Sequence, residues 1–381
     1  MLRTPLQNAL HAHPVNGAQP LCLTDYRGAT TAARFADPQL EFSALLNGCG
    51  IYDLGFHARI SVTGGDRMRW MNGMVTNNIR DLAAGRGVYA FLLNPQGRIL
   101  GDMFVYNQGE ALVVETDRSQ VEKIVATFDH YIIMDDIAVS NLSDQLTAVG
   151  LSGPKSLAVL SAAGIEIPDL QPLQFFTVQC ECQCGCLECT IVRGDDGQQN
   201  SYEIWLAAAH VKQLWDALLK AGATPVGSEG LEMQRIAAGV PLYGVDIRER
   251  DLPQETEQMR ALNFNKGCYV GQEIVERIRS RGNVHRKFAG FLVEGVAAIA
   301  TGAKIVSGKP GEDEKEVGEI TSVALLPASS GERTVALGYI RREVGVPGRE
   351  VAIGTVKATV IQLPLEGVAL GQAEDSLLHQ A

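Results

Sequence analysis

The part of the chain between residues 88 and 139 constrains the fold more than any other. Three strand-like runs are separated by two turn signals that contain glycine. A capping box formed by Ser119 and Glu122 then begins a stretch with apolar residues at helical spacing. The strand-like runs cover residues 88–93, 98–106 and 111–116, and a fourth is expected at 137–139. Hairpins beside a single amphipathic helix predict an antiparallel α+β layer rather than a doubly wound sheet.

The C-terminal part has a different pattern. From residue 288 onward, short apolar alternations are separated by glycine, proline and serine, which predicts an all-β module. A chain of 381 residues is too long for one ordinary core, so two or three domains are expected.

Composition excludes several classes of protein. Hydrophobic residues make up 46% and charged residues 20% of the chain, which is typical of a globular protein. No run approaches about 18 apolar residues and no signal core opens the sequence, so we expect a cytoplasmic protein without a membrane partner and with reduced cysteines. A net charge of -11 argues against nucleic-acid binding.

Residues 266–273, with the sequence KGCYVGQE, place one cysteine between a lysine and the expected start of a helix. A thiol reacts or ligates as the thiolate, and a cationic neighbour and a helix N-terminus both lower its pKa. Cys268 is therefore a candidate nucleophile or ligand. The alternative is that Cys268 is only a small buried residue, which is the commoner role of a free cysteine.

This octapeptide resembles the K-G-C-Y-x-G-Q-E signature of the YgfZ family, and every signature position is filled. That family comprises folate-binding relatives of the glycine cleavage T protein, an aminomethyltransferase, and supports iron–sulfur protein maturation. The likeness extends from about residue 42 to the C-terminus. Four further segments resemble T-protein motifs, and they cover residues 74–78, 89–102, 202–205 and 235–247.

The resemblance implies a set of site residues. Cys268 and Asp102 are expected to be catalytic, and the expected folate-binding residues are Glu203, Arg235, Tyr89, Asp102 and Lys266. A pterin presents two parallel N–H donors, which a buried carboxylate such as Glu203 can accept together.

Each of these assignments has an ordinary alternative. Glu203 can be a solvated strand residue, Arg235 a surface arginine, and Asp102 a turn carboxylate. The T proteins carry an Asp-Asp pair where this chain has Gly101 and Asp102, so one acid is retained and its neighbour is lost.

The resemblance also implies the fold. We expect an α+β, multidomain architecture of the T-protein and YgfZ type around a central folate funnel. A discontinuous folate-binding domain would comprise residues 1–57 and 145–250. A ferredoxin-like domain would comprise residues 58–144 and 251–287, and a C-terminal β-barrel would comprise residues 288–381.

The expected function is that of a tetrahydrofolate-binding protein that assists iron–sulfur cluster assembly or repair, with Cys268 as the key thiol. Its partners would be folate, or a one-carbon derivative, and iron–sulfur client or assembly proteins. On this view a maturation factor is favoured, and a folate-dependent transferase-like enzyme stays open. The alternative is a folate-dependent aminomethyltransferase, which moves a one-carbon unit between folate and an amine donor.

A cysteine cluster between residues 180 and 189 allows a third reading, in which the chain is a metal-binding or structural protein. Five thiols lie within ten residues, but most are spaced by two, which spreads them along a strand. We therefore expect a hairpin that turns near Gly185, and no metal.

Overall fold

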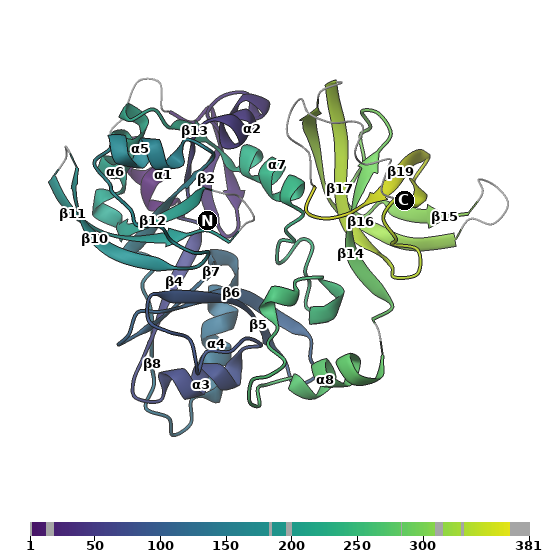
Figure 1. The fold of residues 1–381 in the computed structure, drawn as a ribbon, viewed down its shortest axis with the longest axis horizontal. Coiled ribbons are helices and arrows are strands. Elements are labelled where there is room, and N and C mark those ends of the chain that lie inside the picture. The colour runs from purple at the N-terminus through teal and green to yellow at the C-terminus, as the bar shows by residue number, and fades with distance from the viewer. Residues whose placement is uncertain are drawn as a thin grey trace. The chain divides into compact units, whose positions relative to one another are not determined.

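A computed structural model of the chain describes residues 2–12, 19–182, 185–195, 200–282, 284–308, 315–328 and 331–365 (Figure 1). The chain divides into two compact units. Unit 1 comprises Met1–Pro95, Leu100–Leu231 and Arg260–Gln272, and unit 2 comprises Gln96–Ile99, Glu232–Met259 and Glu273–Ala381. Among the described residues, no helix combines the length and the apolar character needed to cross a bilayer.

Unit 1 contains a six-stranded sheet in the order β10-β11-β12-β9-β3-β13. Its strands are β3 (Gly50–Asp53), β9 (Leu146–Ser152), β10 (Phe175–Cys182), β11 (Gly185–Arg193), β12 (Ser201–Ala207) and β13 (Thr224–Val226). All neighbours pair antiparallel except β13, which runs parallel to β3. A separate hairpin pairs β1 (Cys22–Tyr26) with β2 (Ala29–Arg34).

Helices α1 (Pro5–Ala12), α5 (Ser156–Ala162) and α6 (Val211–Lys220) pack on this sheet (Figure 1). The apolar side chains of α6 form one stripe that is fully buried, because its residues recur on one helical face. That helix ends just before Gly222, whose φ of 103° an L-residue rarely adopts. Helix α2 (Pro38–Asn47) begins at Asp37, which accepts a hydrogen bond from the Gln39 amide.

A second sheet of unit 1 has five strands in the order β5-β6-β7-β4-β8. They are β4 (His57–Thr63), β5 (Arg86–Leu93), β6 (Ile99–Asn107), β7 (Leu112–Asp117) and β8 (Ala138–Asn141). Helices α3 (Arg67–Met74) and α4 (Val121–Tyr131) share its apolar core. The predicted antiparallel α+β layer is therefore confirmed.

The predicted capping box before α4 is wrong. A 3₁₀ turn, Arg118–Gln120, precedes the helix, so Gln120 rather than Ser119 occupies the N-cap position, and its side chain makes no capping hydrogen bond. The Gln120 side chain instead contacts Asp102 on β6. A tertiary contact has replaced the local one.

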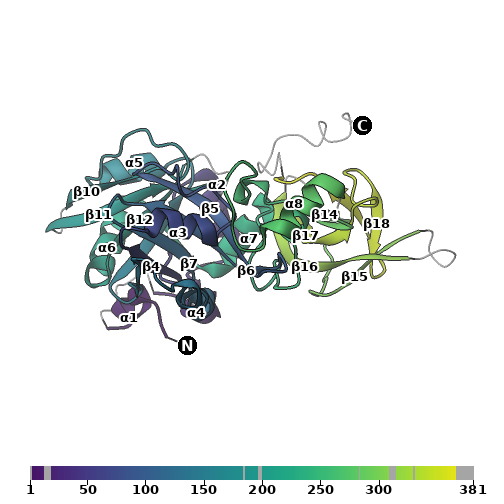
Figure 2. The ribbon, with the colours of Figure 1, turned by 90° about the horizontal axis from the view of Figure 1, so that it is seen from below.

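Unit 2 contains a closed barrel in the order β14-β17-β16-β15-β18-β19 (Figure 2). Its strands are β14 (Arg286–Val293), β15 (Lys304–Ser307), β16 (Lys315–Ala328), β17 (Gly331–Arg341), β18 (Glu350–Ile353) and β19 (Val356–Ile361). Between α6 and the barrel the chain forms α7 (Ser228–Ala238), η3 (Pro253–Glu255), η4 (Met259–Ala261) and α8 (Gln272–Arg281), while the 3₁₀ turn η2 (Ala208–His210) precedes α6 in unit 1. The predicted all-β module is confirmed, while the three-domain division and its boundaries stay a prediction.

The cysteine-rich segment forms the predicted hairpin, in which β10 pairs with β11 down to Cys182 opposite Gly185. Gln183 and Cys184 lie outside the described residues, and so do the side chains of residues 180–182, 185 and 186. The prediction about metal at this segment therefore falls outside what the structure describes. Cys189 is fully buried in the core of the six-stranded sheet.

Candidate functional site

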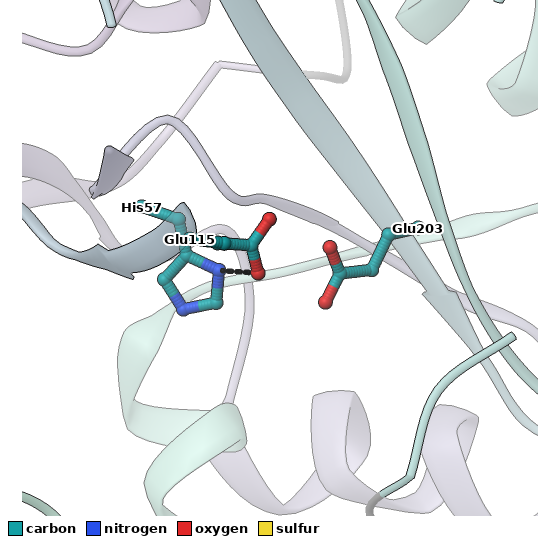
Figure 3. A group of neighbouring side chains, drawn as sticks. All are labelled: His57, Glu115 and Glu203. Atoms are coloured by element: carbon teal, nitrogen blue, oxygen red, sulfur yellow. Dashed lines mark ion pairs between the residues drawn. The ribbon is translucent and has the colours of Figure 1, made fainter. Parts of the chain in front are cut away.

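Two neighbouring strands of the five-stranded sheet carry charged side chains on one face. In the antiparallel pair of β4 and β7, His57 lies opposite Asp117 and Arg59 lies opposite Glu115. Because side chains two residues apart share a face of a strand, all four project to the same side. Strand β12 of the six-stranded sheet adds Glu203, which points toward His57 and Glu115 (Figure 3).

Arg59 joins the two carboxylates. Its side chain is fully buried, and its Nη2 lies 2.6 Å from Glu115 Oε2 and 3.7 Å from Glu203 Oε2. The guanidinium also lies 4.7 Å from the ring of Trp205, whose Nε1 donates a hydrogen bond to Glu203 Oε2 at 2.9 Å. The cation, the indole and the two strands thus fix the orientation of the Glu203 carboxylate.

His57 completes the cluster. Its Nδ1 lies 3.1 Å from Glu115 Oε1 (Figure 3). Its Nε2 lies 3.5 Å from Asp117 Oδ1. Burial lowers the pKa of His57 to about 4 despite these carboxylates, so the imidazole is neutral at pH 7.

The protonation of Glu203 is finely balanced. Burial first, and then repulsion by Glu115, raise the pKa of the Glu203 carboxyl from 4.5 to about 7. The Glu203 side chain is 18% exposed, so a ligand can reach it. A neighbouring group that donates hydrogen bonds would favour the ionised form.

The same group can be tested as a metal site. One ligand atom each from His57, Glu115 and Glu203 lie within 4.8 Å of one another. However, Arg59 already places a cation 2.6 Å from Glu115. A divalent ion would be repelled by that guanidinium, so an organic ligand with N–H donors fits this carboxylate better than a metal does.

Asp102 on β6 is held by two neighbours. Tyr89 donates its hydroxyl hydrogen to Asp102 Oδ2 at 2.6 Å, and Gln120 Nε2 donates to Asp102 Oδ1 at 2.8 Å. Burial and the adjacent carboxylate raise the pKa of Tyr89 well above its usual value, so this phenol remains a donor. Arg260 lies 4.9 Å above the Tyr89 ring.

Gly101, which replaces the first acid of the T-protein pair, faces a different direction from Asp102. A Cβ at this position would meet Gln120 Oε1 at 3.0 Å and the side chain of Ile124 at 3.4 Å. Both contacts lie on the side of helix α4, because successive strand residues point to opposite faces. A side chain at position 101 would therefore contact Gln120, the residue that also bonds the Asp102 carboxylate.

Lys266 is buried, and its ammonium is bonded to the protein backbone. Its buried ammonium donates to three backbone oxygens, those of Asn72 and Val75 at 2.5 Å and that of Asn77 at 2.8 Å. Burial lowers its pKa to about 7, while the three acceptors favour the charged form. These carbonyls use all three N–H donors, so Lys266 holds the end of α3 against the octapeptide. Its part in folate binding stays a prediction.

Cys268 lies exposed in the loop that precedes α8, and its thiol is free. The helix predicted after it does form and begins at Gln272. The structure thus contradicts the alternative of a buried Cys268, and a catalytic role for its thiol stays a prediction.

Arg235 belongs to unit 2 and is buried there. Its guanidinium donates to both Glu232 oxygens, to Asp246 Oδ2 at 2.6 Å, to the Val240 carbonyl and to Ser322 Oγ. Every guanidinium nitrogen has a protein acceptor, which favours a structural role. Its part in folate binding stays a prediction.

Within unit 1, two charged or titratable residues that the sequence did not single out, Asp117 and His57, link the predicted residues Asp102 and Glu203. Asp117 interacts electrostatically with both Asp102 and His57, and His57 interacts with Glu203. The signal for the missed residues was present as charged side chains at a spacing of two, His57 with Arg59 and Glu115 with Asp117. Only the pairing of β4 with β7 reveals that these residues face one another.

Comparison with known proteins places this site in a family context. The family model described as "GCVT N-terminal domain" matches residues 12–266. A curated aminomethyltransferase from Herpetosiphon aurantiacus is 28% identical over 96% of this chain and 98% of that protein. One from Rubrobacter xylanophilus is also 28% identical, over 95% of this chain and 93% of that protein.

A solved structure shares the fold. The glycine cleavage system aminomethyltransferase T from Bartonella henselae superposes with a TM-score of 0.82 and 22% identity, over 95% of this chain and 97% of that one. The predicted T-protein-like fold, with its α+β domains and a closed C-terminal barrel, is confirmed.

These relatives correct the expected function. The role in iron–sulfur cluster assembly, which followed from the octapeptide around Cys268, is wrong, because curated proteins similar over nearly the whole chain are aminomethyltransferases. They support the alternative function and give no support to iron–sulfur partners. The expected ligand is unaffected, since the family uses tetrahydrofolate and its one-carbon derivatives.

Proposed function

The chain belongs to the family of the GCVT N-terminal domain, and on that premise we propose that it is a folate-dependent aminomethyltransferase. It would move a one-carbon unit between an aminomethyl donor and tetrahydrofolate. The observation that carries the proposal is the Glu203 carboxylate, which Trp205 and Arg59 orient and which remains reachable by a ligand.

Glu203 would bind the pterin. A carboxylate can accept both parallel N–H donors of a 2-amino-4-oxopterin, and charge-assisted pairs of this kind are stronger than neutral hydrogen bonds. Its pKa near 7 means that the unliganded carboxyl is about half protonated at neutral pH. Folate binding would then release a proton, and affinity would rise with pH through 7.

Asp102 would manage the proton at the reacting nitrogen of the folate. Tyr89 and Gln120 each donate to one of its oxygens, which fixes the carboxylate without neutralising it. The absence of an acid at position 101 is compatible with this role, because that side chain would face Gln120 and Ile124.

A finer assignment, to the YgfZ subfamily, is also proposed. Its support is the octapeptide at residues 266–273, in which every signature position is filled. Cys268 is exposed, so its thiol is available to a substrate or a partner.

The test is an aminomethyl transfer assay with tetrahydrofolate, in which ammonia release and formation of 5,10-methylene-tetrahydrofolate are measured together. Asp102→Asn should lower kcat by about 100-fold or more, the scale of general acid–base catalysis, while tetrahydrofolate affinity changes little. Asp129→Asn is the matched control, because Asp129 is an exposed residue of α4.

If the protein binds tetrahydrofolate but forms no product in either direction of the reaction, the proposed transferase activity is rejected. Equal rates for the Asp102 and Asp129 variants would reject the role of Asp102 alone.

A further inference from the structure

A polar hollow of about 650 Å³ lies within unit 2, far along the chain from Glu203 and Asp102. It is bounded by the segment around η3 and by strands of the barrel. Basic side chains dominate its lining, namely Arg250, His285, Arg286, Lys304 and Arg341. None of the site residues described above belongs to it.

The hollow has a local excess of positive charge. Arginine and lysine contribute four cations to its lining, against three carboxylates, on a protein whose net charge is -11. One carboxylate is also shared, because Glu319 pairs with Arg250, with Lys304 at 3.9 Å and with Arg248 at 3.3 Å. Glu316 pairs with Lys304 more closely, at 2.9 Å, so the lining cation left without a carboxylate partner among the described residues is Arg341.

Arg341 is the least compensated of these cations. It ends β17, is exposed, and has no ion pair with any described residue. Its guanidinium offers a planar fork of donors, which suits a carboxylate or a phosphate.

Tyr339 lines the hollow and contributes a hydroxyl group. The residue is 3% exposed, and its buried hydroxyl has no hydrogen-bond partner among the described residues. Burial raises the pKa of this phenol, so it remains protonated and can donate. Arg286 stacks 4.7 Å from the ring and bonds Asp251 and Glu255, which holds the tyrosine in place.

We propose that this hollow binds a small organic oxyanion, a carboxylate or a phosphate ester, through Arg341, the cations around Glu319 and the Tyr339 hydroxyl. Such a group would supply the acceptor that Tyr339 lacks and neutralise the excess positive charge. None of its lining residues is a proposed folate-site residue, so it would bind a second ligand or an effector.

The test is equilibrium dialysis of the full chain with radiolabelled inorganic phosphate and, separately, with radiolabelled citrate, at constant ionic strength. Saturable binding near one equivalent is expected. Arg341→Gln should weaken it about tenfold or more, the scale of a lost charged hydrogen bond. Arg349→Gln, an exposed arginine of the same unit outside the lining, should leave it unchanged.

Tyr339→Phe is the second variant. It removes a hydroxyl without a partner among the described residues, so the fold should be retained while binding weakens. Saturation by phosphate alone assigns the site to phosphate esters, saturation by citrate alone assigns it to carboxylates, and saturation by both assigns it to oxyanions generally. Absence of saturable binding of either probe would overturn the proposal. Equal losses of anion affinity in the Arg341 and Arg349 variants would also overturn it. The Glu203→Gln variant should bind the anion as the parent protein does.

Discussion

Replacement of Glu203 by glutamine should weaken folate binding and, at the same time, stabilise the unliganded protein. Glutamine keeps the size of the side chain and an oxygen for the Trp205 indole, but it removes the charge that would pair with the pterin. The loss in binding free energy should be about 1.5–3 kcal/mol, the scale of a hydrogen bond to a charged group.

The gain in stability follows from the raised pKa. Burial and Glu115 raise the pKa of Glu203 from 4.5 to about 7, so the folded protein binds this proton more tightly than the unfolded chain does. The resulting stabilisation is complete below pH 4.5 and is lost as the pH rises to 7. A tenfold change in proton affinity is worth about 1.4 kcal/mol, so the loss approaches roughly 3 kcal/mol.

His57 contributes a pH dependence of the opposite sign. Burial lowers its pKa from 6.5 to about 4, so this contribution to the free energy of unfolding rises with pH between those values. The variant must therefore be compared with the parent protein at each pH, because the parent's own profile also includes other buried groups with shifted pKa values, such as Glu115 and Asp117.

The assay is urea unfolding without ligand at about pH 4.5 and pH 8, together with isothermal titration of tetrahydrofolate at pH 8. We expect similar stability at the lower pH, a Glu203→Gln variant that is more stable at pH 8, and weaker folate binding there. A variant that is less stable than the parent at pH 8 would refute the electrostatic reasoning. Unchanged affinity would remove Glu203 from the folate site.

Three further predictions concern neighbouring features. Lys266→Met should lower the free energy of unfolding by roughly 3 kcal/mol in urea titrations, because three buried carbonyls lose a charged donor. Gly101→Asp should cost about 1–3 kcal/mol by the same measurement, since the new Cβ displaces Gln120. A maleimide should label Cys268 in the native protein much faster than the buried Cys49, as peptide mass spectrometry can determine. Equal labelling of the two thiols would contradict the exposure of that loop.

Local patterns predicted the elements that depend on near neighbours in sequence. The turn between residues 93 and 98 and the apolar spacing of α4 are properties of short segments, so the hairpin and the helix followed from them. The capping box at Ser119 failed for a reason outside its own segment, because Asp102 holds Gln120.

The charged cluster around Arg59 could not be predicted from periodicity, because periodicity does not show which strands pair. Arg59 and Glu115 are 56 residues apart in sequence, and only the strand register brings them together. Lys266 was recognised as a member of a motif, but its acceptors lie about 190 residues earlier in the chain. Spacing identified the important residues here, while their partners depended on the fold.

The Lys266 contact also has a consequence for how the chain reaches its native state. The ammonium closes a loop of 194 residues to Asn72, and such distant closures cost more conformational entropy than local hairpins do. During synthesis, the carbonyls at the end of α3 would therefore lack the Lys266 ammonium until the octapeptide has left the ribosome. The segment that the family model matches ends at Lys266. A fragment that ends a few residues earlier would therefore lack the contact between Lys266 and the backbone of residues 72–77. We expect such a fragment to be cleaved by proteases near residues 72–77.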